Sequence, residues 1–112
     1  MRSAGWFIDE FTWSKAEKKT ARRAFDQAYR RKCADVVAQL RKMVASVSSP
    51  SDLWQIHDYL SEQRKTTDKT FDYRHSVLLS VFSHLLREGW LTEADLVGLQ
   101  EDKIERIKRW AA

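Results

Sequence analysis

The sequence predicts an all-α protein in which a long helical stalk carries a small helical head. Its 112 residues include only three glycines and one proline, so turns are scarce and long helices are expected. No stretch alternates apolar and polar residues as a half-buried strand does. With 43% hydrophobic residues, the chain suits one small domain without room for a second core. We expect a single domain over residues 1–112, with a tail at 1–13, a stalk at 14–66 and a head at 67–112.

The tail, MRSAGWFIDEFTW, is rich in aromatic residues and precedes any helix start signal. It contains Trp6, Phe7, Phe11 and Trp13. A terminal segment of this kind either packs on its own dimer, frays, or recognises a separate partner. The sequence leaves these alternatives open.

A long first helix is predicted from residue 14 to residue 46 or 47. Ser14 opens a capping box with Glu17, and no helix breaker follows. At about 1.5 Å per residue, the helix is roughly 50 Å long, more than a small globule can bury within itself. Apolar residues recur along this helix at alternating spacings of four and three, which is typical of a coiled-coil seam. They are Tyr29, Cys33, Val36, Leu40, Met43 and Val47. This seam indicates a dimer.

A second helix is predicted over residues 50–66, with Ser49 as its cap, Pro50 at its first position and Asp52 completing a second capping box. Its segment DLWQIHDYLSEQR mixes polar groups into an apolar face. The apolar stripe is Leu53, Ile56 and Leu60, but His57 and Arg64 project close to it, and the adjoining flank carries Trp54, Asp58 and Ser61. We expect this helix to form a protein-binding and self-association surface.

Arg64 and Asp58 favour an antiparallel dimer. A buried Arg64 without a partner would cost several kcal/mol, and Asp58 is the nearest strong acceptor in the sequence. The two residues lie about 120° apart on one helix, so they do not easily pair within it. In an antiparallel dimer Asp58 of one chain would face Arg64 of the other twice, with His57 and Trp54 near the twofold axis. The alternative is that both side chains stay in water.

The remaining residues are predicted to close a small head. A polar loop is expected at residues 66–74, and a strongly apolar third helix at 72–88, which Gly89 ends as a C-terminal cap. Thr92 with Asp95 caps a short fourth helix. A final amphipathic helix over EDKIERIKRW presents Ile104, Ile107 and Trp110 on one face.

The sequence gives no sign of catalysis, so we predict that the protein is not an enzyme and has no cofactor, catalytic residue or metal site. The three histidines lack metal-ligand spacing, and neither HExxH nor CxxC occurs. Cys33 lies on the packing stripe and is predicted to be a buried, inert thiol. Its isolation excludes an intramolecular disulfide and fits a reducing cytoplasm. Without a long apolar run or a signal sequence, the chain is expected to be soluble, with no integral membrane association.

The charge is uneven along the chain. Residues 1–48 carry eleven basic and five acidic residues (+6), whereas residues 49–112 carry nine and eleven (−2). A basic rod attracts acidic protein surfaces or nucleic acid. Nucleic-acid binding is the weaker interpretation, because the segment TEADLVGLQ, which stands where a recognition helix would, is acidic and apolar.

Four segments of the chain together resemble the fluorescence recovery protein family of cyanobacteria. They are WSKAEKKTARRAFDQAYRR, DLWQIHDYLSEQR, DYRHSVLLSVFSHLLREG and DKIERIK, and the similarity covers residues 13–110. The resemblance implies an all-helical, cytoplasmic and thylakoid-proximal protein whose first two helices form an antiparallel homodimer with helical heads at its ends.

The resemblance also implies a function. Members of the family bind the photoactivated orange carotenoid protein, chiefly its C-terminal domain. They accelerate the return of its red form to the orange form and promote its release from the phycobilisome, which ends non-photochemical quenching. Only the partner carries a carotenoid.

Site residues can be assigned by the same resemblance. The functional cluster at the dimer interface comprises Trp54, His57, Asp58, Arg64, Val37 and Leu40. The partner-binding surface of the head comprises Ser80, Phe82 and Arg106. Ser80 and Arg106 stand where the family carries an aromatic residue and a lysine, and Phe82 is retained.

The difference at Ser80 leaves a second interpretation open. The family has relatives in bacteria that lack the carotenoid protein. In the second interpretation, the chain is such a relative, or a reconstructed ancestor, and has another native partner. A third interpretation, from another class, is a basic helical protein that associates with nucleic acid.

Overall fold

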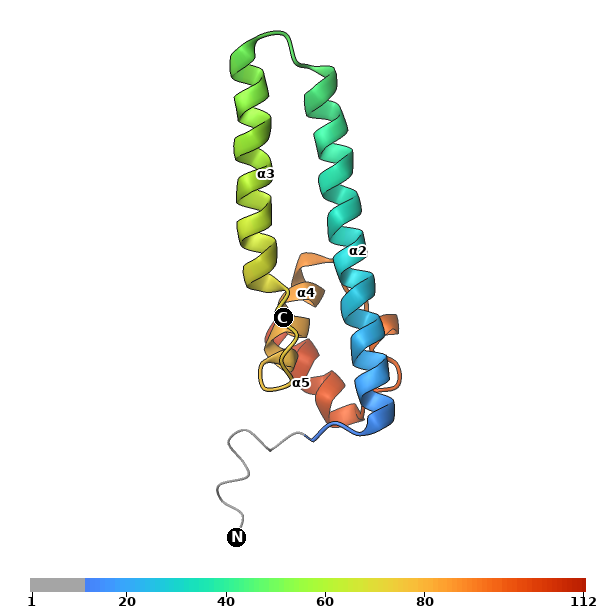
Figure 1. Cartoon of the computed structure of the whole chain (residues 1–112). Coiled ribbons are helices and arrows are strands. Elements are labelled where there is room, and N and C mark those ends of the chain that lie inside the picture. The colour runs from blue at the N-terminus through green and yellow to red at the C-terminus, as the bar shows by residue number, and fades with distance from the viewer. Residues whose placement is uncertain (1–11) are drawn as a thin grey trace.

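The structure is a computed structural model that describes residues 12–112, and it consists of a long helical hairpin joined to a small head (Figure 1). The elements are α2 (Lys15–Ala45), α3 (Pro50–Thr70), α4 (Leu78–Glu88), the 3₁₀ helix η1 (Glu93–Leu96) and α5 (Glu101–Ala111). Residues 12–112 form no strand, which confirms the all-α prediction. Most of the predicted tail, residues 1–11, lies outside the described residues.

Both capping boxes predicted for the hairpin are present. The Ser14 hydroxyl accepts a hydrogen bond from the Glu17 amide (3.1 Å), and the Glu17 carboxylate accepts one from the Ser14 amide (3.2 Å). At the start of α3, the Asp52 carboxylate accepts bonds from the amides of Ser48 (2.9 Å) and Ser49 (3.1 Å). These local bonds place both helix starts where the sequence predicts them.

The loop between hairpin and head lies further along the chain than the sequence predicts. The second helix continues to Thr70, and the third begins at Leu78, whereas we expected residues 66 and 72. In the intervening segment, Phe71 and Tyr73 pack edge to face on Phe25 of α2, with ring centroids 5.5 and 4.9 Å apart. This tertiary packing holds residues 71–77 against α2 in a non-helical conformation, which a local pattern does not reveal.

The head core is built from α4, α5 and the first half of α2 rather than from the C-terminal helices alone. Ala21, Ala24 and Ala28 are buried, and their small side chains allow close packing against α2. They belong to one hydrophobic cluster with Phe25, Leu78, Leu79, Val81, Phe82, Leu85, Leu91, Leu96, Leu99 and Ile107. The second half of α2 extends beyond this core to form the hairpin with α3 (Figure 1).

The described part of the molecule is elongated. Its principal extents are 65 × 27 × 25 Å, and its radius of gyration is 17.7 Å, compared with about 13 Å for a compact domain of this size. The structure therefore has a hairpin and a head, which share the long helix α2.

Two glycines of the head adopt positive φ. Gly89 (φ 88°) ends α4 in the left-handed conformation, as the sequence predicts. Gly98 (φ 116°) lies against α2, and a Cβ at this position would be 2.7 Å from the Thr20 hydroxyl oxygen. Gly98 is thus required both for its backbone conformation and for close packing of the loop on α2.

Candidate functional site: the hairpin seam and the head surface

The hairpin carries large apolar side chains on its surface. Ile56 is the only buried residue of α3. Leu53 and Trp54 are 52% and 62% exposed, and the other exposed large apolar residues of the hairpin are Tyr29, Val37, Val44, Val47 and Leu60. An exposed apolar surface of this extent is typical of a protein interface.

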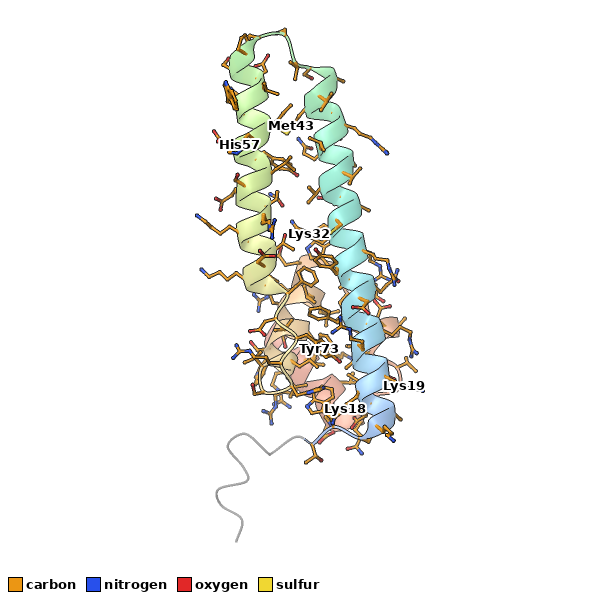
Figure 2. All side chains as sticks on the ribbon, in the orientation of Figure 1. Lys18, Lys19, Lys32, Met43, His57 and Tyr73 are labelled. Carbon is orange, nitrogen blue, oxygen red and sulfur yellow. The ribbon has the colours of Figure 1, made fainter. Side chains whose placement is uncertain are left out.

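A groove of 470 Å³ runs between α2 and α3 next to the head. Val37 and Arg64, both predicted site residues, line it together with Tyr29, Lys32, Cys33, Val36, Leu60, Gln63, Thr67 and Asp68. Cys33 is half-buried rather than fully buried as predicted. Leu40 is also half-buried, one turn beyond the groove, and Met43 lies on the side of α2 that faces α3 (Figure 2). The residues of the predicted seam on α2 therefore face α3, while the side chains at the edge of this seam remain exposed.

The polar cluster predicted on α3 is exposed in the single chain. The Trp54 and His57 rings meet edge to face with centroids 6.4 Å apart, and His57 Nδ1 lies 3.4 Å from the Asp58 carboxylate. Asp58 and Arg64 do not pair with each other, and Arg64 instead bonds Asp68 at 3.4 Å. Ion pairs this exposed contribute little to stability, so the cluster is available to a partner.

The head residues assigned by resemblance do not share one surface. Ser80 is exposed, and the Arg106 guanidinium is half-buried over the Trp110 ring, 5.4 Å from its centroid. Phe82 has no exposed surface, so it packs beneath the head surface rather than on it. It shares the inward helical face of α4 with Leu78 and Leu85, a spacing of four and three that indicates a core position.

A buried ion pair between α2 and α5 was not predicted from the sequence. Glu17 and Lys103 are 4% and 2% exposed, and the Lys103 Nζ lies 3.1 Å from both carboxylate oxygens. Glu17 also accepts a bond from the Gln100 amide at 2.9 Å, and the Lys103 ammonium lies 5.0 Å from the centroid of the Trp13 ring. Although burial raises the pKa of Glu17, the bonds from Gln100, Ser14 and Lys103 outweigh it and lower that pKa.

A second ion pair joins α2 to η1. The Arg31 guanidinium donates to the Asp95 carboxylate at 2.7 Å and to the Trp90 carbonyl at 2.9 Å. The bond from Arg31 holds the pKa of Asp95 below its ordinary value, and Asp95 raises the pKa of Arg31. The two ion pairs attach η1 and the start of α5 to the same helix, α2, which fixes the position of this part of the head on the hairpin.

Residues 12–112 contain no group of three or more histidine, cysteine, aspartate or glutamate side chains placed to hold a metal ion. In the same residues, no helix combines the length and apolar character needed to cross a membrane.

Comparison with known families agrees with this geometry. A model of the family described as "Photoprotection regulator fluorescence recovery protein" matches residues 13–111. The chain belongs to the fluorescence recovery protein family. A curated fluorescence recovery protein from Synechocystis sp. is 36% identical over 102 residues, which cover 91% of this chain and 94% of the relative. Membership places the chain among regulatory proteins rather than enzymes.

Solved structures of the fluorescence recovery protein family match the fold closely. The structure from Fremyella diplosiphon has a TM-score of 0.84 at 35% identity, covering 89% of this chain and 98% of that one. The structure from Synechocystis sp. has the same TM-score at 36% identity, with the same coverage. The hairpin and head described above are thus the fold of this family.

Proposed function

We propose that the chain is a non-enzymatic regulator that binds the photoactivated orange carotenoid protein and accelerates its return from the red to the orange form. In this role it promotes release of the carotenoid protein from the phycobilisome in the cytoplasm. The observation that carries the proposal is the family match over residues 13–111, which includes both the hairpin and the head.

Acceleration of a partner's conformational change requires differential binding. The chain must bind the compact form of the carotenoid protein, or the barrier leading to it, more tightly than the extended photoactivated form. A rigid binding surface is suited to this task because it does not adapt equally to every state. The pairs Glu17–Lys103 and Arg31–Asp95 give the head such rigidity. Ser80 and Arg106 would contact the partner's C-terminal domain, with Phe82 packed beneath the surface as support.

We further propose that the hairpin forms an antiparallel homodimer. The exposed apolar residues of the hairpin and the groove beside Val37 and Leu60 provide a surface that a second copy would cover. Trp54, the most exposed of the hairpin's large apolar side chains, would be buried by the second copy. Asp58 of each chain would pair with Arg64 of the other, so these charged side chains would gain partners as they leave water.

A charge exchange tests the dimer. Arg64→Asp and Asp58→Arg are each expected to raise the dimer dissociation constant by roughly 30-fold or more, because each leaves like charges facing each other across the interface. The double variant is expected to recover most of this loss. Sedimentation equilibrium measures the three variants, and Lys65→Asp, at the exposed neighbouring position, serves as the control. A double variant that dimerises no better than either single variant contradicts the cross-chain pair.

The regulatory proposal is tested by mixing the chain with photoactivated carotenoid protein and following absorbance in the dark. We expect the red-to-orange recovery rate to rise with chain concentration and then saturate. Recovery that is unchanged at a saturating concentration, from a chain that still dimerises, contradicts the proposal.

One observation favours a second candidate function. Ser80 is exposed and small, at the position where the resemblance implies an aromatic residue, so the head offers less apolar contact area there. The second candidate is a dimer of the same fold that acts on a partner other than the carotenoid protein. A Ser80→Phe variant separates the two, because it should strengthen recovery only if this surface meets the carotenoid protein.

A further inference from the structure

The first half of α2 carries a concentrated set of cations on its outward face. Six basic side chains are exposed between residues 15 and 30, namely Lys15, Lys18, Lys19, Arg22, Arg23 and Arg30, and we refer to them as the basic face. They project away from the buried positions Ala21, Ala24 and Ala28, and Lys18 and Lys19 lie at the end of α2 remote from the hairpin turn (Figure 2).

The basic face is almost unneutralised by the described residues. Arg22 pairs with Asp26 at 3.2 Å, and Arg30 bonds the neutral Gln27. Lys15, Lys18, Lys19 and Arg23 make no ion pair with any side chain in residues 12–112. The other acidic residue of this part of α2, Glu17, faces inward and is neutralised by Lys103.

This arrangement opposes the stability of the helix that carries it. Lys15 with Lys19, Lys18 with Arg22, and Lys19 with Arg23 are like charges four residues apart, each of which destabilises a helix by about 0.2–0.5 kcal/mol. Lys15 and Lys18 also lie in the first turn of α2, where the helix dipole is positive and acidic residues are favoured. An ordinary solvated helix face mixes both signs, so these positions point to a negatively charged partner.

The surroundings of the basic face indicate what kind of anion fits it. Glu93 lies in η1, which packs along α2, and Glu101 and Asp102 begin α5 beside the Gln100 amide that bonds Glu17. The basic face is therefore a narrow strip bordered by carboxylates. A long phosphate polymer lying across it would meet those carboxylates, whereas a compact acidic patch would not.

A lipid surface fits less well. A helix that lies on a membrane needs large apolar side chains next to its cations. The only large apolar side chain exposed between Lys15 and Arg30 is Tyr29, and its ring already packs on Phe71 with centroids 5.3 Å apart. We propose that the basic face docks on a carboxylate-rich patch of a partner protein, separate from the hairpin seam and from the surface around Ser80.

The experiment compares two triple variants with equal net charge. The first variant reverses three charges of the basic face and is Lys15→Glu/Lys19→Glu/Arg23→Glu. The second, a control, reverses three exposed cations elsewhere and is Arg41→Glu/Lys42→Glu/Arg109→Glu. Each variant changes the formal net charge from +4 to −2. Binding to a labelled glutamate peptide of about 20 residues is measured by fluorescence anisotropy at about 50 and 150 mM salt. We expect the first triple variant to bind at least 10-fold more weakly than the wild type, and the second to bind within about twofold of it.

Thermal unfolding of the same variants provides an independent readout. The first variant places a glutamate at the N-terminus of α2 and glutamates three residues before Lys18 and Arg22, so its Tm should rise slightly, although positions 15/19 and 19/23 again carry like charges. The control cations lie near the C-terminal ends of α2 and α5, so their reversal should lower Tm. A first variant that is more stable yet fails to bind the peptide supports the proposal.

Three results would overturn the proposal. The first is an absence of wild-type binding to the peptide at about 50 mM salt. The second is equal loss of binding in both triple variants, which would show an effect of net charge alone. The third is tighter binding to duplex DNA, or to phosphatidylglycerol vesicles, than to the peptide. This comparison is made at equal anion concentration and about 150 mM salt, and such a result would assign the basic face to another class of partner.

Discussion

Replacing Lys103 with methionine is expected to lower the free energy of unfolding by about 3–5 kcal/mol at neutral pH, because the substitution leaves the Glu17 carboxylate charged and buried without its cation. Glu17 is 4% exposed in the wild type. It would keep the amide hydrogen bonds from Gln100 and Ser14 and lose both contacts with the Lys103 ammonium. Chemical unfolding measures the effect. Lys108→Met, which breaks the exposed contact with Glu93, serves as the control and should change stability by less than about 1 kcal/mol.

The loss in Lys103→Met should depend on pH. The folded-state pKa of wild-type Glu17 lies below its ordinary value of 4.5. Its contribution to stability is therefore present above pH 4.5 and is lost as the pH falls through the lowered pKa. The variant lacks the Lys103 contacts that lower the pKa of Glu17, so burial raises this pKa above its wild-type value. As the pH falls, the buried carboxylate of the variant is therefore protonated at a higher pH than that of the wild type. The stability difference between wild type and variant should shrink from pH 7 towards about pH 4. A difference that does not change with pH would show that lost packing, not charge, is responsible.

Replacing Gly98 with alanine is expected to lower the free energy of unfolding by about 2–4 kcal/mol. The added methyl group must adopt φ 116° and lie 2.7 Å from the Thr20 hydroxyl oxygen, so the loop would be pushed away from α2. Gly89→Ala is the matched control: Gly89 also has positive φ, but a Cβ there has no neighbour within 4 Å. That control should lose about 1 kcal/mol, from backbone strain alone.

The Thr20 side chain separates the two components of the Gly98 effect. In a Thr20→Ala background the close contact is removed, and Gly98→Ala should cost about as much as Gly89→Ala. Thermal or chemical unfolding of the four variants gives the coupling. A cost for Gly98→Ala that is the same with threonine or alanine at position 20 would contradict the proposed steric contact.

Local sequence signals predicted the parts of the fold that local interactions decide. The capping residues Ser14, Ser49 and Thr92 each begin a helix because their partners lie three residues away, and Gly89 ends α4 because of its own φ. The start of the third helix was missed because contacts of Phe71 and Tyr73 with Phe25 decide it. Those contacts span more than 40 residues of sequence, so no helical period contains them.

The site was less predictable than the fold. The sequence indicated that Asp58 and Arg64 do not pair within one helix, and the structure agrees. It did not indicate the Glu17–Lys103 pair, because the partners are 86 residues apart and a lysine in an amphipathic helix normally faces water. The motif that carries the family resemblance led to Phe82 being assigned to a surface, whereas its spacing from Leu78 and Leu85 already indicated the core.

We propose that the chain ends quenching by acting on the carotenoid protein. The most direct measurement uses isolated phycobilisomes quenched by photoactivated carotenoid protein and follows antenna fluorescence in the dark after the chain is added. We predict that fluorescence returns faster as chain concentration rises, and that the carotenoid protein separates from the phycobilisomes on the same timescale. Fluorescence that returns at the same rate with and without the folded chain would contradict this proposal.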